Sequence, residues 1–220
     1  FSSQTNDARN FVETTFQQLS LALSIKLHGS IDQNQFLLTP LGVLKPTTWT
    51  CPARAEGDFS KMLGTNIRLL IVGFRGLYTF PIKAIETVLK DQLHGWPLAD
   101  NIHTLEVALK TLPDQLSPVE LAHHMEKDDV IADLERHLAP YVEEKKITHI
   151  AFPPCMGLEK VDQILNRFRE QWNVRCFETL ATIPSMPGFR LRRNIEKLLE
   201  SKTSVWNIIP GDVVGYQAKD

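Results

Sequence analysis

The chain has 220 residues, of which 43% are hydrophobic and 23% charged, and its formal net charge is −2. This length and composition are typical of one compact globular domain with a sizeable core, or of one domain with an appendage. The low net charge and the lack of a basic tract interleaved with aromatics argue against a nucleic-acid-binding protein. The apolar runs are far too short to span a membrane, and no amino-terminal segment resembles a signal peptide.

The three cysteines, Cys51, Cys155 and Cys176, are widely spaced and form no Cys-x-x-Cys pair. The sequence therefore offers no zinc ribbon and no iron–sulfur ligand set, and we predict no metal site. We expect reduced thiols in a cytosolic protein. The chain begins with Phe1 rather than methionine, so we expect it to be processed or to be part of something larger.

Residues 1–50 are predicted to form an accessory layer. Apolar side chains recur at helical spacing from Asp7 to Leu27, which predicts a helix. Two short apolar runs between Gln35 and Leu44 flank Thr39-Pro-Leu-Gly42, which predicts a β-hairpin or a sharp bend. Residues 51–66 are irregular and polar and are predicted to be a loop or linker.

Residues 67–220 are predicted to form an α/β domain, because strand and helix patterns alternate there. Strands are expected at 67–72, 103–109, 147–152, 174–180 and 205–209, with helices at 78–93, from 117 onward, at 159–172 and at 189–200. Ser117, Pro118 and Glu120 match a capped helix start, and Pro140 is expected to end or kink that helix. The alternation predicts a Rossmann-like fold with a mainly parallel sheet and helices on both faces.

The first candidate site is the turn after the predicted strand at 67–72. Gly73 and Gly76 lie in this turn, but a dinucleotide fingerprint needs Gly-x-Gly-x-x-Gly, and no P-loop lysine follows. A tight turn without a ligand explains the pattern. A ligand site stays open as an alternative, because Arg75 would face the carboxyl ends of the strands, where α/β sheets bind ligands.

The second candidate site is a similar turn, from Ala151 to Leu158. Cys155 would lie near a helix amino terminus, where the helix dipole lowers the pKa of a thiol. A nucleophilic cysteine also needs a base, and His149 lies inside the predicted strand with nothing to orient it. A packed cysteine that behaves as a small hydrophobe is the alternative.

The third candidate site is the segment from Pro184 to Arg193, which places Arg190, Arg192 and Arg193 in the first turn of a predicted helix. Cations there oppose the helix dipole, unless an anion lies among them and the free backbone amides. The anion could be a substrate phosphate, a carboxylate or an acidic partner surface. A solvated basic face is the alternative.

Four stretches taken together resemble the B subunit of the anaerobic glycerol-3-phosphate dehydrogenases, which are flavoproteins. They occur in order and are accompanied by two short motifs near the end of the chain. The stretches are Thr39–Trp49, Ile71–Leu77, Phe152–Leu158 and Gly188–Leu191, and the two motifs are Val205-Trp206 and Pro210-Gly-Asp212. That family carries a glycine-rich flavin-nucleotide hairpin and further flavin-binding segments, which this sequence lacks. The resemblance therefore implies a middle domain, inserted between the two halves of a flavin domain.

The resemblance implies a part in oxidising sn-glycerol 3-phosphate to dihydroxyacetone phosphate, with electrons passed through flavin toward menaquinone and then fumarate or nitrate. It implies an A subunit that carries FAD, FMN assigned to the B subunit, and an iron–sulfur C subunit that anchors the complex at the inner face of the cytoplasmic membrane. We expect this chain to bind no flavin and to be inactive by itself.

In flavoproteins of this build, an inserted domain caps the isoalloxazine and helps shape the substrate pocket. Arg190 is then the first candidate to meet the substrate phosphate or the flavin domain, and Arg75, Arg192 and Arg193 are further candidate substrate-binding residues. The candidate cofactor-side residues are Thr39, Gly42, Gly73, Gly76 and Gly188.

Two other functions stay open at this point. One is a non-catalytic domain that docks neighbouring subunits, with its arginines matched to acidic patches. The other is a stand-alone α/β enzyme that uses Cys155 as its nucleophile.

Overall fold

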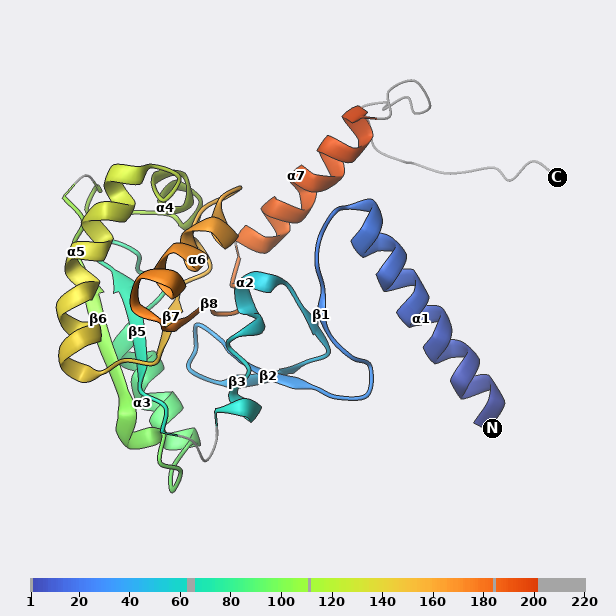
Figure 1. The fold of residues 1–220 in the computed structure, drawn as a ribbon, viewed down its shortest axis with the longest axis horizontal. Coiled ribbons are helices and arrows are strands. Elements are labelled where there is room, and N and C mark those ends of the chain that lie inside the picture. The colour runs from blue at the N-terminus through green and yellow to red at the C-terminus, as the bar shows by residue number, and fades with distance from the viewer. Residues whose placement is uncertain (1, 63–65, 111, 184, 202–220) are drawn as a thin grey trace.

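A four-stranded parallel sheet forms the centre of the molecule (Figure 1). The structure is a computed structural model, which describes residues 2–62, 66–110, 112–183 and 185–201. The strand order is β6-β5-β7-β8. These strands are β5 (Leu69–Phe74), β6 (Ile102–Val107), β7 (His149–Phe152) and β8 (Arg175–Glu178).

Helices cover both faces of this sheet, with α3 on one face and α5 and α6 on the other (Figure 1). The predicted α/β fold with a parallel sheet is therefore confirmed. The helices that follow the first sheet strand are α3 (Ile82–Gln92), the 3-10 helix η2 (Ala99–Asn101), α4 (Pro118–His124), α5 (Asp128–Lys145), α6 (Val161–Trp172) and α7 (Met186–Ser201).

Strand β5 is central because both its edges are paired and every one of its residues is buried. Its unbroken apolar run is typical of a parallel strand covered on both faces. The next strand in the chain, β6, pairs with one edge of β5, and β7 pairs with the other. The chain therefore reverses its direction of winding at β5 and β7. The crevice outside the carboxyl ends of such strands is where α/β folds bind ligands.

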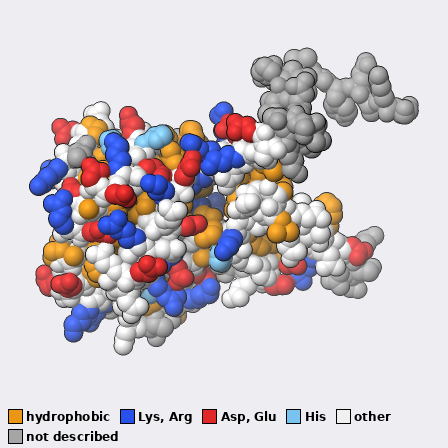
Figure 2. Space-filling model, turned by 45° about the horizontal axis from the view of Figure 1, so that its top comes forward, with side chains coloured by type: hydrophobic (Ala, Val, Ile, Leu, Met, Phe, Trp, Pro, Cys, Tyr) orange, Lys and Arg blue, Asp and Glu red, His pale blue; other side chains and the backbone are white. Residues whose placement is uncertain are grey.

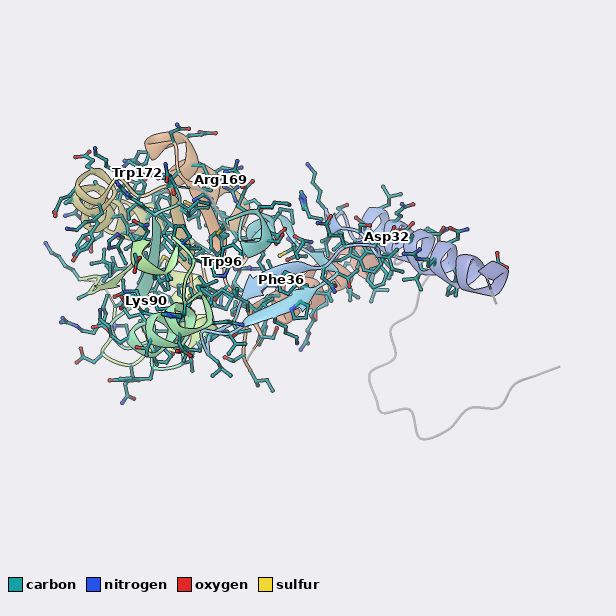
Figure 3. The ribbon with its side chains drawn as sticks, turned by 90° about the horizontal axis from the view of Figure 1, so that it is seen from below. Asp32, Phe36, Lys90, Trp96, Arg169 and Trp172 are labelled. Atoms are coloured by element: carbon teal, nitrogen blue, oxygen red, sulfur yellow. The ribbon has the colours of Figure 1, made fainter. Side chains whose placement is uncertain are left out.

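The amino-terminal residues form the predicted accessory layer of a helix and a hairpin (Figure 1). Helix α1 (Ser2–Ala22) lies away from the sheet, and Phe16 stacks on Trp49 with ring centroids 4.4 Å apart. The hairpin pairs β2 (Gln35–Leu38) with β3 (Leu44–Thr47) in antiparallel register. A second small pair joins β1 (His28–Gly29) to β4 (Trp49–Thr50). Figure 3 shows Phe36 on the hairpin, between the sheet domain and the helix beyond it.

The segment predicted to be a loop, 51–66, is in part helical. It contains helix α2 (Pro52–Ala55) and the 3-10 helix η1 (Phe59–Lys61), and the side chains of Ala53, Phe59 and Met62 are buried. The buried Asp58 carboxylate accepts hydrogen bonds from the backbone of Phe36 at 3.1 Å and Ser60 at 3.2 Å. This segment therefore packs the hairpin onto the core. The division into residues 1–50, 51–66 and 67–220 stays a prediction.

The capped helix start at Ser117 is confirmed, but the helix is shorter than predicted. Ser117 and Glu120 form a complete capping box, and α4 then ends at His124. Helix α5 begins at Asp128 and continues through Pro140 to Lys145, so the proline does not end the helix. The buried side chains of Leu134, Leu138 and Val142 hold the helix against the core on both sides of the proline. The strand expected at 205–209 and the motif at 210–212 lie outside the described residues.

Charges of both signs are interspersed over the face shown in Figure 2. Within the part of the chain that the structure describes, no helix has the length and hydropathy needed to cross a bilayer. Among the same residues, no group of three or more His, Cys, Asp or Glu side chains could hold a metal ion.

Candidate functional site

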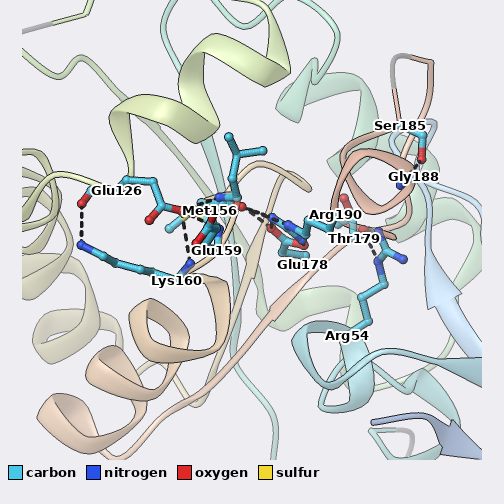
Figure 4. A network of polar contacts seen from close by, with 12 residues as sticks. Arg54, Glu126, Met156, Glu159, Lys160, Glu178, Thr179, Ser185, Gly188 and Arg190 are labelled. Atoms are coloured by element: carbon cyan, nitrogen blue, oxygen red, sulfur yellow. Dashed lines mark hydrogen bonds and ion pairs between the residues drawn. The ribbon is translucent and has the colours of Figure 1, made fainter. Parts of the chain in front are cut away.

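A buried ion pair joins the end of β8 to helix α7 (Figure 4). The guanidinium of Arg190 contacts both carboxylate oxygens of Glu178, at 2.6 Å from Nη1 and 2.8 Å from Nη2. Its Nε donates a further hydrogen bond to the carbonyl oxygen of Gly157 at 3.0 Å. The Glu178 side chain is fully buried, and that of Arg190 is 13% exposed. A bidentate pair of this kind fixes both position and orientation.

The pair favours the charged form of Arg190. Burial by itself lowers the pKa of Arg190, and the Glu178 carboxylate more than offsets this effect and raises it. Removing one partner of such a pair leaves an uncompensated buried charge, which costs about 3–5 kcal/mol. The pair therefore holds α7 firmly against the carboxyl end of the sheet.

The turn after β7 has its backbone amides engaged by carboxylates of the protein. Glu178 accepts a hydrogen bond from the Met156 amide at 2.9 Å. Glu126 accepts from the amides of Leu158, Glu159 and Lys160 at the start of α6, at 2.8 Å and 3.2 Å for the last two. Burial raises the pKa of Glu126, and these three backbone hydrogen bonds outweigh it and lower the pKa. Glu126 thus occupies the position where a bound anion would meet this helix.

The three arginines of α7 each have a carboxylate partner within the chain. The sequence predicted these arginines in the first turn of the helix. Because α7 begins at Met186, Arg190 lies in the second turn instead. The partner of Arg190 is Glu178; Arg192 pairs with Glu196 at 2.7 Å, and Arg193 pairs with Glu159 at 2.6 Å. The last two pairs are exposed. The predicted substrate-binding role of these arginines is not tested by these contacts and stays a prediction.

Gly73 was predicted to lie in the turn, but it lies within β5, and only Arg75 and Gly76 follow the strand at the carboxyl end of the sheet. A Cβ on Gly73 would lie 2.5 Å from Cγ2 of Ile82, and a Cβ on Gly76 would lie 2.7 Å from the carbonyl oxygen of Asp114. Close packing therefore explains both glycines. Arg75 is exposed, and its backbone amide donates to the carbonyl oxygen of Val107 at 2.9 Å. Substrate and cofactor roles for this turn stay predictions.

The remaining candidate cofactor-side residues also have local structural roles. The Thr39 hydroxyl oxygen accepts hydrogen bonds from the amides of Leu41 at 3.3 Å and Val43 at 3.2 Å, which closes the hairpin turn. Gly42 has a φ of +82°, and its Cβ position lies 2.7 Å from the carbonyl oxygen of Ile85 on α3. The Gly188 amide donates to Oγ of Ser185 at 3.2 Å, which caps α7.

Cys155 is not a reactive thiol in this structure. It is completely buried, and burial together with the nearby Glu178 carboxylate raises its pKa well above the usual value, against a smaller opposite effect of Arg190. His149 lies at the other end of β7, and burial lowers its pKa to about 4. Helix α6 begins at Val161, six residues beyond Cys155, so the thiol does not lie at the helix amino terminus as predicted. These observations argue against a stand-alone enzyme with a Cys155 nucleophile.

A cavity of about 670 Å³ lies at the opposite end of the sheet, at the amino ends of β7 and β8. Its lining includes His149 and Arg175. Its charged groups pair with one another: Arg175 contacts Glu56 at 3.0 Å, and Lys61 contacts Asp58 at 3.3 Å. We therefore place the candidate site at the carboxyl ends of the strands, where ligands bind in open α/β sheets.

The sequence predictions missed Arg54, Glu126 and Glu178. Arg54 lies in the segment that was predicted to be a loop, although it is buried on α2. Glu178 carried a usable signal, because it is the one acidic residue within the apolar run Cys176-Phe-Glu-Thr-Leu180. A charge in a buried strand requires a partner. Glu126 carried no such signal, since its position depends on how α4 and α6 pack.

These residues define an α/β domain with a paired, buried charge cluster at the carboxyl edge of its sheet. No protein-family model and no solved structure matches the chain. Curated proteins that resemble the chain in sequence indicate a more specific family. Three of these relatives share one name, that of the B subunit of anaerobic glycerol-3-phosphate dehydrogenase.

The relative from Pasteurella multocida (strain Pm70) is 25% identical over 185 residues, which cover 82% of this chain and 42% of the relative. The relative from Actinobacillus pleuropneumoniae serotype 5b (strain L20) is 24% identical over 189 residues, 84% of this chain and 43% of its own length. The relative from Haemophilus influenzae (strain PittGG) is 25% identical over 192 residues, with the same two coverages of 84% and 43%.

The resemblance predicted from the ordered motifs is therefore confirmed: the chain is similar to the B subunit of anaerobic glycerol-3-phosphate dehydrogenase. It spans less than half the length of these relatives, between 42% and 43%. The name of those proteins describes them as subunits of an oxidoreductase that acts in an assembly.

Proposed function

We propose that this chain is the middle, cap or substrate-side domain of the B subunit of a flavin-dependent anaerobic sn-glycerol-3-phosphate dehydrogenase. The observation that supports this proposal is the similarity to that subunit, which extends over 82–84% of the chain. In this proposal the parent protein takes part in oxidising glycerol 3-phosphate to dihydroxyacetone phosphate, and flavin passes the electrons on toward quinone. Flavin supplies the hydride chemistry, and the protein supplies binding and orientation.

The proposed partners are a catalytic A subunit and an iron–sulfur C subunit, which would hold the complex at the inner face of the cytoplasmic membrane. Within this chain, the bidentate contact between Arg190 and Glu178 would keep the start of α7 in a fixed place. A fixed helix start is what a cap needs, because a displacement of about 1 Å can cost two orders of magnitude in rate.

The glycine turns of this chain do not fit the phosphate of a flavin nucleotide. The amides after β7 are engaged by Glu126 and Glu178, and Gly76 packs against the backbone of Asp114. This favours a flavin held by other segments of the parent protein. Titrating the 220-residue chain with FMN and FAD, followed by flavin fluorescence, tests the point. Tight, saturable binding of either flavin would contradict the cap assignment.

The role of Arg190 is tested in the complete parent protein within its assembly. We expect Arg190→Ala to lower glycerol-3-phosphate oxidation strongly and Arg192→Ala to lower it much less. The two residues lie on the same helix, but only Arg190 belongs to the buried pair. If Arg190→Ala leaves both activity and assembly intact, the assignment of α7 to the substrate side is wrong.

A non-catalytic docking domain is the second candidate function, and the surface of α7 favours it. This helix projects from the body of the molecule (Figure 1), and its apolar side chains Phe189, Leu191 and Ile195 are 40–44% exposed. Under this function, the association of subunits would weaken with salt and with charge reversal at Arg192 or Arg193. Unchanged association of those variants would count against docking through α7.

A further inference from the structure

A cavity of about 360 Å³ lies between the hairpin turn, the end of β8 and the start of α7. Its polar lining comes from three separate parts of the chain. The residues concerned are Thr39, Lys45, Arg54, Thr182 and Ser185. The hairpin is fixed beside β8 by the amide of Leu180, which donates to the carbonyl oxygen of Leu38 at 2.8 Å. The cavity is therefore built by long-range contacts of the fold.

Arg54 is a buried cation with no ion-pair partner among the residues that the structure describes. It is only 8% exposed, and its Nε donates a hydrogen bond to the carbonyl oxygen of Thr179 at 3.0 Å. Its Nη2 is buried without a hydrogen-bond partner, and so is Oγ1 of Thr179, as far as residues 2–62, 66–110, 112–183 and 185–201 are concerned. Buried charges are normally paired, and an unsatisfied buried donor costs about 1–3 kcal/mol, more if it is charged.

The buried carboxylate at the end of β8 is engaged by groups other than Arg54. Glu178 is already held by Arg190 and by the amide of Met156 (Figure 4). Figure 4 also shows the guanidinium of Arg54 extending toward the turn that carries Ser185 and Gly188. The unsatisfied donor thus lies beside the first turn of the 16-residue helix α7, whose dipole favours negative charge.

The charged residues that line the cavity are both cations. Lys45 is the second of them; it is exposed and forms no ion pair with any residue that the structure describes, and no carboxylate side chain lines the cavity among those residues. The hydroxyls of Thr39, Thr182 and Ser185 complete the polar lining. Because Thr39 accepts two amide hydrogen bonds and Ser185 accepts one, each hydroxyl hydrogen remains available to donate.

We propose that this cavity binds a phosphate-type oxyanion, with Arg54 as the buried charged donor, Lys45 as the second cation, and the Thr39 and Ser185 hydroxyls as further donors. A tetrahedral dianion satisfies several converging donors at once, and arginine is suited to recognising it. The anion could be free phosphate or the phosphate group of a small phosphorylated molecule or nucleotide. The inference rests on contacts within this chain and not on the proposed dehydrogenase role.

The first test is a calorimetric titration of the 220-residue chain with inorganic phosphate, at an ionic strength held constant with chloride. We expect saturable binding that Arg54→Gln weakens at least about tenfold and Lys45→Gln weakens about threefold, as loss of a buried and of an exposed charged contact would do. Arg175→Gln is the matched control, because it removes an exposed arginine at the amino end of β8, opposite the end that borders this cavity, and should leave the affinity unchanged. Equal affinity in the parent chain and all these variants would overturn the inference.

The second test uses the wild-type chain and therefore does not depend on how Arg54→Gln folds. Cys51 is partly exposed, and burial raises its pKa while the Arg54 charge lowers it, whereas Cys155 and Cys176 are buried. An anion at Arg54 offsets that charge, so the pKa rises and fewer thiolates are present. We expect phosphate to slow alkylation of Cys51 in a saturable way, with the midpoint at the calorimetric Kd. An alkylation rate independent of phosphate would overturn the site.

Comparing ligands separates this inference from the proposed function. If sn-glycerol 3-phosphate binds more tightly than phosphate and depends on Arg54, both are supported. If phosphate binds through Arg54 but glycerol 3-phosphate gains nothing over it, the oxyanion site stands and the substrate role of this domain fails. If FMN binds more tightly than phosphate and depends on the same residues, the oxyanion site is supported and its ligand is a nucleotide. If none of the three binds, the site is overturned, while activity of the complete assembly still decides the proposed function.

Discussion

The turns after β5 and β7 look alike in sequence, but their partners differ. Each runs from a buried strand through a turn that ends in Gly-Leu, at Gly76-Leu77 and Gly157-Leu158. The first is held by packing: Gly76 lies against the backbone of Asp114, and its carbonyl oxygen accepts from the Leu116 amide at 3.1 Å. The second is held by charge, through the Glu126 carboxylate at its amides and the Arg190 guanidinium at the Gly157 carbonyl oxygen.

This difference shows that a glycine turn at the end of a strand does not define a nucleotide site. Such a turn presents amides, and what binds them is decided by residues distant in the sequence. Here Glu126 lies 32 to 34 positions before the amides that it accepts from. The chain itself supplies the anion that a phosphate would supply in a nucleotide-binding protein.

The largest effect is expected from breaking the buried ion pair that supports the turn after β7. Glu178→Gln leaves Arg190 buried without its counter-charge and should lower the free energy of unfolding by about 3–5 kcal/mol. Urea denaturation measures this change. Arg192→Gln, which removes an exposed ion pair, serves as the control and should cost less than about 1 kcal/mol. Similar losses in the two variants would show that the buried pair is not special.

Gly76→Ala tests the close packing that holds the turn after β5. Gly76 has a φ of +89°, and its Cβ would lie 2.7 Å from the Asp114 carbonyl oxygen, so backbone strain and overpacking add together. We expect a loss of about 2–4 kcal/mol in unfolding free energy. Gly95→Ala is the matched control, because Gly95 has a φ of +83° with nothing within 4 Å of its Cβ position. Equal losses in both would mean that packing on Asp114 contributes nothing.

Glu126→Gln should have a smaller effect, with a characteristic pH dependence. Glutamine keeps the shape but loses the charge-assisted bonds to three amides, which costs about 1 kcal/mol at neutral pH after allowance for solvent screening. Because the folded-state pKa of Glu126 is lowered, its stabilisation is present above the usual value of 4.5 and is lost as the pH falls through the lowered pKa. The two proteins should therefore become equally stable in strong acid.

The matched comparison matters here because His149 also responds to acid. Its pKa is lowered from 6.5 to about 4, so the stabilisation from keeping it neutral is lost as the pH falls through this range. The parent chain and Glu126→Gln share that loss, and their difference isolates Glu126. A stability difference that stays the same from neutral pH to strong acid would contradict the role of its charge.

Arg75→Gln should have the smallest effect. The Arg75 side chain is exposed. The hydrogen bond that this residue makes in the turn comes from its backbone amide, which glutamine retains. We expect thermal denaturation to show a change within about 0.5 kcal/mol. A larger loss would mean that the two turns are more alike than their contacts indicate. A loss of activity in the complete assembly with unchanged stability would support a ligand role for Arg75.

The order of helices and strands could be predicted from the sequence better than the side-chain contacts of the candidate site. Alternating patterns placed the four sheet strands, and the hydroxyl, proline and glutamate at 117–120 placed a helix start, because these signals are local. The partners of Arg190, Glu126 and Arg54 could not be predicted, since each depends on the packing of elements far apart in the chain. The arginines of α7 did indicate an anion nearby, and for Arg190 that anion is the Glu178 side chain. The helical segment at 52–61 was missed because its few apolar residues show no periodicity.

The contact between α2 and the end of β8 has a consequence for how the chain folds. Arg54 and Thr179 are bonded across 125 positions, and a Cβ on Gly57 would collide with the ring of Phe177 at 2.5 Å. The hairpin segment can therefore reach its final place only after β8 has left the ribosome. Contacts so distant in sequence make folding slow. During synthesis α2 lacks its contacts with β8 until that strand has been made, and during this time the segment is open to chaperones and to aggregation.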